Sequence, residues 1–348
     1  MKKFLSRFSP MRRQSRQQSL KQLAFGFGAS LVVGAAILGG LSVIRPADAQ
    51  SSVWGDNDTQ QSSTTVSSSS SVWSSAANSG ATTSNSTPST TPTQTTTAAT
   101  RGTYAALGDS VAAGLGLPIV SNATAADQQC GRSSQAYPNQ VADARGLQLV
   151  FAACSGATAG DLVTQQRVNG NNPERQIDAA FAGGVPSLIT VTAGANDMHW
   201  QDFIKKCYAA TCGSSFDNAA VSTLLTAMRA KMTYFLAETR LRSGTQTPPT
   251  VILTGYYYPV SANCANQQFT AAEISWLRSS VDRLNQALRQ TATLYGFARY
   301  VPVSFSGHEL CTNSPWVQGL TDAAPVHPTA AGQQAIARSI TQSLANRP

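Results

Sequence analysis

From residue 103 onward, short apolar runs alternate with longer segments whose apolar residues recur at helical spacing. The short runs are rich in β-branched and aromatic residues, which predicts buried strands. They lie at 103–107, 147–153, 187–193, 250–256 and 298–304. Strands that alternate with helices predict a parallel sheet covered on both faces. The sequence therefore predicts one three-layer α/β/α domain over 102–348, with a parallel sheet of about five strands.

The longer segments predict the helices that cover this sheet. They span 218–243, 271–296 and 328–346. In the second of them, apolar residues step by three or four positions and form one face of a helix. These residues are Ile274, Leu277, Val281, Leu284 and Leu288. In a sheet of this kind, functional residues are expected in loops at the carboxyl ends of the strands.

The first 49 residues have the plan of a secretory signal peptide. A basic region over 2–21 precedes an apolar run over 23–44, and Ala-Asp-Ala before Gln50 predicts a cleavage site. The apolar run has 22 residues, which is enough to span a bilayer, so an uncleaved membrane anchor is the alternative. Both interpretations predict that the rest of the chain is secreted or lies on the extracellular cell surface.

Serine and threonine dominate the next segment, where they make up 28 of residues 51–100. The segment has no apolar periodicity and cannot bury enough apolar surface to offset its chain entropy. We therefore expect a disordered linker over 50–101, through which the domain could be tethered to a membrane or cell wall.

The formal net charge of +8 does not indicate a nucleic-acid partner. Residues 1–49 hold eight of the 25 basic residues and one of the 17 acidic residues. The remainder has 17 basic and 16 acidic residues, a net charge of +1. Since the basic excess belongs to the leader, we expect no binding of nucleic acid by the folded domain.

All six cysteines lie after residue 129, and an even number in an exported chain predicts three disulfides. A metal site is less favoured, because the chain has no Cys-x-x-Cys sequence. Many pairings are open to six cysteines. Pairing neighbours in order closes loops inside successive segments without crossing. The pairs predicted in this way are Cys130–Cys154, Cys207–Cys212 and Cys264–Cys311.

A candidate nucleophile, Ser110, directly follows the first predicted strand in the sequence Leu-Gly-Asp-Ser. A serine hydroxyl is a weak nucleophile, so it needs a base within hydrogen-bond reach and donors for the oxyanion that forms. Of the three histidines, His327 precedes the last predicted helix, and the following proline suits a first helical turn. This position, in combination with the motifs considered next, makes His327 the candidate base. His199 could line the same cleft, and His308 is better explained by a structural hydrogen bond.

Two other strand ends supply candidate oxyanion donors. Asn196, in Gly-Ala-Asn-Asp, follows the third predicted strand, and its side-chain amide can donate a hydrogen bond. Gly156 follows the second strand and could present a backbone N–H with no side chain in the way. The ordinary alternatives are an asparagine that bonds its own backbone and a glycine in a turn.

In this order the motifs resemble those of the GDSL or SGNH hydrolases, from about residue 103 to the C-terminus. The matching blocks are Gly-Asp-Ser at 108–110, Gly156, Gly-Ala-Asn-Asp at 194–197 and His-Pro at 327–328. Further sequences at 254–259 and 307–311 resemble the secreted bacterial esterases and lipases, a branch with three sequential disulfides.

The resemblance implies that Ser110 is the nucleophile and His327 the base. It also implies an oxyanion hole made by the backbone N–H groups of Ser110 and Gly156 and by the side chain of Asn196. The family usually has an aspartate three residues before the histidine, where this chain has Ala324.

Two groups could take the place of the missing aspartate. Either Asp322 reaches the imidazole, or a backbone carbonyl near Ala324 orients it, as the resemblance implies for some secreted members. A carbonyl can fix the tautomer but gives less help to the imidazolium that forms. We favour the carbonyl and keep Asp322 as the alternative third member.

The function that this resemblance implies is an exported serine esterase or lipase that hydrolyses carboxylic esters through an acyl-enzyme. Lipids, acylated sugars and small esters are all candidate substrates. An O-acetyl esterase acting on polysaccharide or cell wall is one alternative, and a non-catalytic cell-surface binding module is another. The chain has no Gly-x-Ser-x-Gly elbow, no His-Glu-x-x-His and no phosphate-binding Gly-rich loop, so we expect no metal or cofactor.

Overall fold

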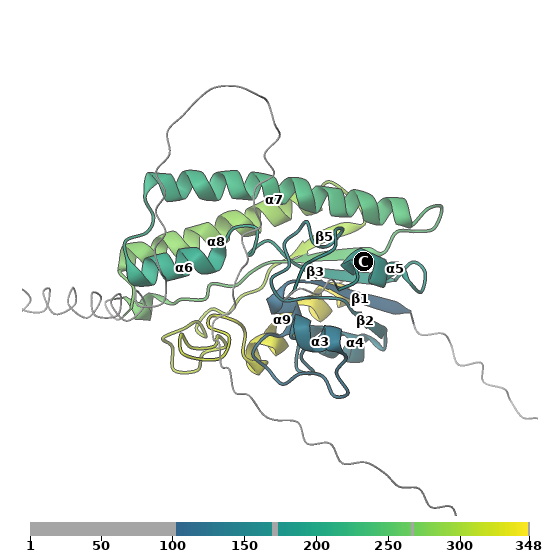
Figure 1. Ribbon diagram of the computed structural model, residues 1–348, viewed down its shortest axis with the longest axis horizontal. Helices are drawn as coiled ribbons and strands as arrows, with labels where there is room; N and C mark the ends of the chain where they lie inside the picture. Colours follow the sequence, from purple (N-terminus) through teal and green to yellow (C-terminus); the bar gives the residue numbers. More distant parts are fainter. Residues whose placement is uncertain (1–101, 169–172, 266–267, 347–348) are drawn as a thin grey trace, which may run out of the picture. The chain divides into compact units, whose positions relative to one another are not determined.

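The computed structural model describes residues 102–168, 173–265 and 268–346 (Figure 1). The predicted leader over 1–49 and linker over 50–101 lie outside the described residues. Within the described ranges, no helix combines the length and the apolar character that crossing a membrane requires.

Five parallel strands form one sheet, in the order β2-β1-β3-β4-β5. The strands are β1 (Thr103–Gly108), β2 (Gln148–Phe151), β3 (Leu188–Thr192), β4 (Thr250–Thr254) and β5 (Ala298–Val301). Each lies in or overlaps one of the apolar runs. The central strand β3 is buried along its whole length, and the hydroxyls of its two threonines, Thr190 and Thr192, are hydrogen-bonded to buried tyrosines. The predicted parallel α/β domain is confirmed.

Helices cover both faces of this sheet (Figure 1). The chain passes from β1 outward to β2 and then back across β1 to β3, so right-handed crossovers place the connecting helices on opposite faces. One face carries α4 (Tyr137–Arg145) and α9 (Ala330–Ala345), which pack against each other. The other carries α5 (Gln176–Phe181), α7 (Ser215–Arg242) and α8 (Ala271–Ala292), with α6 (Trp200–Ala209) beside α8.

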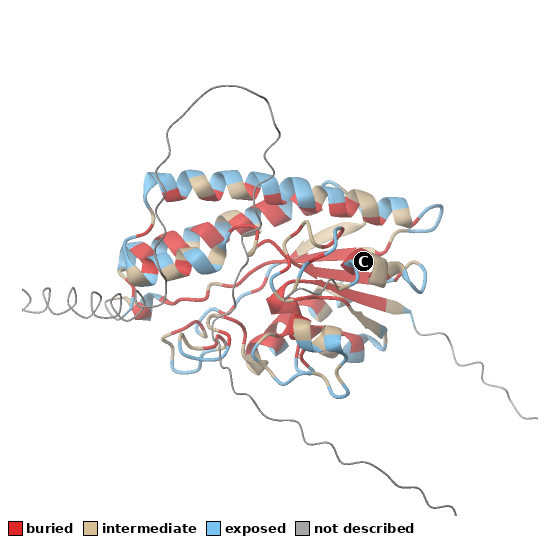
Figure 2. Ribbon diagram, in the orientation of Figure 1, coloured by how far each residue is buried: buried red, intermediate tan, exposed pale blue. Residues whose placement is uncertain are grey.

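The three predicted long helices correspond to α7, α8 and α9. The apolar face predicted for α8 is buried, and Figure 2 shows the buried sides of α7 and α8 turned toward the sheet. α7 begins three residues earlier than predicted, because Ser214 and Asp217 form a capping box at its start.

The shorter helices were not predicted from the sequence. They are α2 (Ser110–Ala113), α3 (Ala125–Cys130), α4, α5 and α6, together with the 3-10 turn η2 (Ala262–Cys264). Helices of four to nine residues contain too few turns to show a clear apolar period, whereas the ten residues of α6 do form an apolar face that was not recognised in the sequence.

The structure joins Cys130 to Cys154, Cys207 to Cys212 and Cys264 to Cys311, which is the predicted pairing. The first bridge ties the end of α3 to the loop that follows β2. This loop contains Gly156, so the bridge anchors one of the candidate oxyanion donors.

The strand order reverses at β1, whose neighbours β2 and β3 are reached by connections on opposite faces. Loops leaving the carboxyl ends of two such strands diverge and leave a crevice between them. Ser110 follows β1 and Asn196 follows β3, so both residues lie at this crevice.

The close approach of β1 to β3 requires glycine at position 108. Gly108 has φ of +130°, and a Cβ added there would lie 2.1 Å from the carbonyl oxygen of Thr192 on β3. The side-chain amide of Gln176 forms hydrogen bonds with both backbone groups of Gly108. Its Oε1 accepts from the Gly108 N–H at 2.7 Å, and its Nε2 donates to the Gly108 carbonyl at 3.0 Å.

We expect Gly108→Ala to lower Tm by more than about 6 °C or to prevent folding. The reason is that backbone strain of about 1–3 kcal/mol adds to a steric clash, and each kcal/mol is worth about 2–4 °C in a domain of this size. Thermal unfolding followed by circular dichroism measures the change. The control is Gly183→Ala, whose added methyl group meets no atom within 4 Å. Equal melting of the two variants would contradict this account of Gly108.

Candidate active site

Ser110 is the first residue of the short helix α2, directly after β1. Asp109 caps this helix, and its Oδ1 accepts a hydrogen bond from the Val111 N–H at 2.9 Å. Gly114, in the left-handed conformation, ends the helix and donates to the Ser110 carbonyl. The helix is thus capped at both ends, and these caps fix the backbone that carries the Ser110 hydroxyl.

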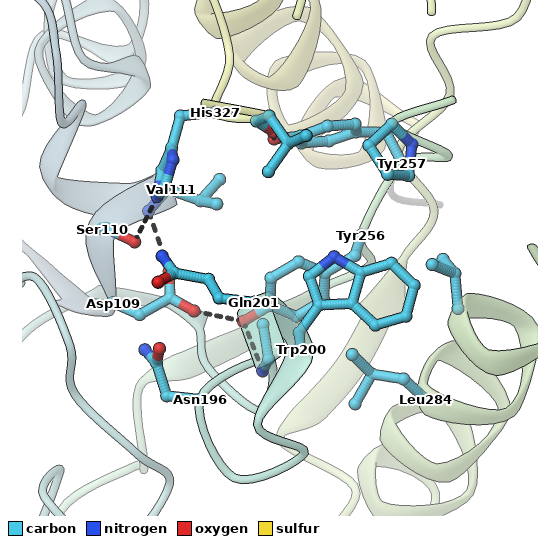
Figure 3. A pocket seen from close by; sticks show the side chains of 14 residues that line it. Asp109, Ser110, Val111, Asn196, Trp200, Gln201, Tyr256, Tyr257, Leu284 and His327 are labelled. Carbon is cyan, nitrogen blue, oxygen red and sulfur yellow. Dashed lines mark hydrogen bonds between the residues drawn. The ribbon is translucent and has the colours of Figure 1, made fainter. Parts of the chain in front are cut away.

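His327 lies beside Ser110, although 217 residues separate them in the sequence (Figure 3). The distance from Nε2 of His327 to Oγ of Ser110 is 2.7 Å. Both side chains are more than nine-tenths buried. The structure therefore brings together the predicted nucleophile and the predicted base in the geometry that proton transfer requires.

The other ring nitrogen of His327, Nδ1, lies 3.0 Å from the carbonyl oxygen of Pro325. A carbonyl oxygen can only accept, so this contact places the proton on Nδ1 and leaves Nε2 free to accept from Ser110. Burial lowers the pKa of His327 below its usual 6.5, although the carbonyls of Pro325 and Ala324 act in the opposite direction. The imidazole is therefore neutral at pH 7, which is the state of a general base.

Asp322 is not in contact with the imidazole. It is exposed, and its Oδ2 accepts from the Gly319 N–H at 2.6 Å. The geometry agrees with orientation by a backbone carbonyl near Ala324: Nδ1 of His327 lies 3.0 Å from the Pro325 carbonyl, and the Ala324 carbonyl also acts on the imidazole. The Ala324 carbonyl accepts in addition from the backbone N–H of His327 at 3.2 Å. Val326, between Pro325 and His327, has φ of 62°, and this turn directs the Pro325 carbonyl back toward the ring.

The three predicted oxyanion donors lie on neighbouring loops. Gly156 has φ of 81° in the loop after β2, and Asn196 donates from Nδ2 to the Ala157 carbonyl in that loop at 2.9 Å. This bond uses one amide hydrogen of Asn196 and leaves the second. Within the described ranges, the backbone N–H groups of Ser110 and Gly156 donate to no acceptor.

The Gly156 loop is also held by the residue after Asn196. Oδ2 of Asp197 accepts from the Ala159 N–H at 2.7 Å, and its Oδ1 accepts from Nζ of Lys231 at 2.9 Å. Burial raises the pKa of Asp197, and the Lys231 ammonium and the Ala159 N–H counteract this rise. Two adjacent side chains, Asn196 and Asp197, therefore fix the position of the Gly156 loop relative to β3.

A cleft opens beside Ser110 and His327, with mostly apolar walls (Figure 3). Trp200 comes from the start of α6, Tyr256 and Tyr257 follow β4, and Val281 and Leu284 come from α8. No role for these aromatic residues was predicted from the sequence. Two signals were available for the tyrosines: they lie at the carboxyl end of a predicted strand, and they belong to the sequence at 254–259 that resembles the secreted branch.

The two other histidines have different surroundings. His199 has its side chain more than half exposed, with Nδ1 3.9 Å from an Asp202 oxygen, and it is not part of the cleft wall. His308 stacks on Trp316 with ring centroids 3.8 Å apart, and its Nδ1 lies 2.7 Å from the Ser314 carbonyl. His308 is therefore held in a structural contact, as the sequence had suggested.

In the part of the chain that the structure describes, no group of three or more His, Cys, Asp or Glu side chains is placed to hold a metal ion. The chemistry available in the cleft is that of a serine, a neutral histidine and nearby N–H donors. This set is suited to acyl transfer.

Comparison with known proteins gives a family match and a set of relatives. The profile of the GDSL-like Lipase/Acylhydrolase family matches residues 106–335. A lipase of Streptomyces rimosus is 28% identical over 242 residues, which are 66% of this chain and 82% of that lipase. Lipase 2 of Streptomyces coelicolor is 30% identical over 262 residues, 67% of this chain and 83% of its own length.

Solved structures of related proteins have the same fold. The extracellular lipase from Streptomyces rimosus aligns with a TM-score of 0.54 at 25% identity, covering 69% of this chain and 99% of that chain. Phospholipase A1 from Streptomyces albidoflavus aligns with a TM-score of 0.55 at 25% identity, covering 70% and 99%.

We expect kcat/KM for ester hydrolysis to fall in acid with a pKa below 6.5 and to be flat near pH 8. The reason is that the base must be neutral and burial lowers the pKa of His327. The measurement is a profile of kcat/KM from pH 4.5 to 9.

A second buried acid makes a control necessary. Burial raises the pKa of Asp109 to about 7, against the hydrogen bonds from Tyr256 and the α2 N–H groups. The acid limb should persist in Asp109→Asn, because His327 is unchanged. A limb with a pKa above 7, or one that disappears in this variant, would contradict the assignment to His327.

We expect Asp322→Asn to keep kcat/KM within about threefold of the parent. The asparagine oxygen can still accept from the Gly319 N–H, and the structure places no Asp322 atom on the imidazole. The same ester assay measures the effect. A loss of about 10⁴-fold, the order seen when an orienting carboxylate is replaced by its amide, would restore Asp322 as the third member.

Proposed function

The chain belongs to the GDSL-like lipase/acylhydrolase family of serine ester hydrolases, and we propose that it is an exported esterase or lipase using Ser110 and His327. The observation that carries the proposal is the 2.7 Å contact from His327 Nε2 to Ser110 Oγ, on an imidazole oriented by the Pro325 carbonyl. A binding module would not need a neutral, oriented base beside a serine hydroxyl.

In the proposed reaction, Oγ of Ser110 attacks the ester carbonyl carbon while Nε2 of His327 takes the hydroxyl proton. The new C–O bond gives a tetrahedral intermediate. Its oxyanion accepts hydrogen bonds from the backbone N–H groups of Ser110 and Gly156 and from the free amide hydrogen of Asn196. Loss of one such donor typically costs about 3–4 kcal/mol of transition-state stabilisation.

The intermediate collapses when the C–O bond to the alcohol breaks, and His327 gives its proton to the leaving oxygen. Water then attacks the acyl-enzyme, with its proton passing to Nε2, and a second collapse releases the acid and restores Ser110. In both acylation and deacylation, the Pro325 carbonyl accepts a hydrogen bond from the Nδ1–H of the imidazolium.

The walls of the cleft support an apolar acyl group as the part of the substrate nearest Ser110. Trp200, Val281 and Leu284 offer no charge, and the acidic side chain in the cleft, Asp109, is already bonded to Val111 and Tyr256. Relatives described as lipases and as a phospholipase A1 support lipid esters as the substrate class.

Export is part of the proposal. The six paired cysteines favour an oxidising compartment, and one solved relative is described as an extracellular lipase. A leader over 1–49 and a linker over 50–101, with the hydrolase domain from 102, complete the proposed organisation.

We expect the full chain to hydrolyse p-nitrophenyl esters, and Ser110→Ala and His327→Ala each to lose at least about 10³-fold in kcat, because each removes half of the nucleophile–base pair. Acetate, butyrate and palmitate esters measure the preferred acyl length and separate an acetyl esterase from a lipase. Ser339→Ala is the matched control, since this serine bonds only within α9.

Thermal unfolding shows whether the inactive variants remain folded. Full activity in Ser110→Ala would refute the role of Ser110. A parent that is inert toward all three esters and is not labelled by a serine-directed phosphonate would favour the binding module instead.

A further inference from the structure

The hydroxyl group of Tyr256 lies between the two loops that form the proposed site (Figure 3). It donates to Oδ2 of Asp109, the residue before Ser110. It also accepts from the backbone N–H of Ala195, the residue before Asn196, at 3.3 Å. One oxygen atom therefore touches the immediate neighbours of both the proposed nucleophile and the proposed amide donor.

We propose that Tyr256 is a positioning residue that fixes the spacing between Ser110 and Asn196. The inference rests on the proposed function, because it concerns the geometry of the oxyanion hole. It assigns to Tyr256 a role that its ring, as part of the cleft wall, would not have.

Tyr256 is itself held from outside the two loops. Its backbone N–H donates to Oδ1 of Asn285 on α8 at 2.8 Å, and its carbonyl accepts from Nδ2 of Asn285 at 2.8 Å. The preceding residue, Gly255, donates to the Val301 carbonyl on β5 at 2.8 Å. These bonds attach Tyr256 to α8 and to the sheet, so its hydroxyl can act as a fixed reference point for both loops.

Asp109 transmits this position to the nucleophile. Its side chain is buried, and its second oxygen, Oδ1, caps the helix that begins at Ser110. A shift of the carboxylate would therefore move the start of α2 and with it the Ser110 hydroxyl and N–H.

Small displacements matter here because oxyanion donors act at about 2.7–3.1 Å, and a misplacement of about 1 Å can cost on the order of 100-fold in rate. Phenylalanine at position 256 would keep the cleft wall but lose both hydroxyl contacts. We expect Tyr256→Phe to lower kcat by about 10- to 100-fold, with KM within about threefold of the parent.

The experiment is a double-mutant cycle in the full chain, with p-nitrophenyl butyrate as the substrate. It compares the parent, Tyr256→Phe, Asn196→Ala and the double variant. If Tyr256 acts by placing the Asn196 amide against Ser110, the loss of kcat in the double variant is at least about tenfold smaller than the product of the two single losses.

Tyr104→Phe is the matched control. Its hydroxyl is buried in the sheet and bonds to Oγ1 of Thr190 at 2.7 Å, away from the cleft. We expect Tyr104→Phe to lower Tm by about as much as Tyr256→Phe does, but to leave kcat unchanged.

Three results would overturn the inference while the parent remains active and Ser110→Ala inactive. They are a kcat of Tyr256→Phe within threefold of the parent, an equal loss in Tyr104→Phe, and losses that simply multiply in the double variant. A parent without esterase activity would instead overturn the proposed function, and this inference with it.

Discussion

The site depends on the close approach of β1 and β3 at their carboxyl ends. The Asp109 N–H donates to the Thr192 carbonyl at 2.8 Å, and Gly108 leaves no side chain between the strands. This contact brings the chain segments after the two strands to one crevice at the reversal of the strand order. Of the groups in the proposed mechanism, Ser110 and Asn196 are positioned by these two strand ends, whereas His327, the Pro325 carbonyl and the Gly156 loop come from other segments.

Burial determines the chemistry of the nucleophile–base pair. A carboxylate beside His327 would raise the pKa of the imidazole, but the group at Nδ1 is the neutral Pro325 carbonyl. Burial therefore prevails and lowers the pKa of His327 below its usual 6.5, which favours the neutral form of the base. The same arrangement stabilises the imidazolium less than a carboxylate would, and the N–H donors around the oxyanion become more important for the rate.

The sequence predicted the elements whose signals are local. Five buried runs gave the strands, and long apolar periods gave α7 to α9. Ser110 and His327 were candidates from their places at a strand end and before a helix, and the family resemblance implied their roles. The sequence indicated only a carbonyl near Ala324, because which carbonyl lies at Nδ1 of His327 depends on the turn at Val326. Trp200 and Tyr256 line one cleft because the start of α6 and the segment after β4 are brought together by the tertiary fold, which no local sequence pattern encodes.

Ser110 lies near the start of the folded domain and His327 near its end, 217 positions later. During synthesis, the nucleophile and the oxyanion loops leave the ribosome long before the base does. A partial chain can pair its first strands while it still lacks the residue that activates Ser110. If the proposed mechanism holds, ester hydrolysis begins only when the segment that carries His327 has been made and can dock beside Ser110, so an incomplete copy of the chain is inactive.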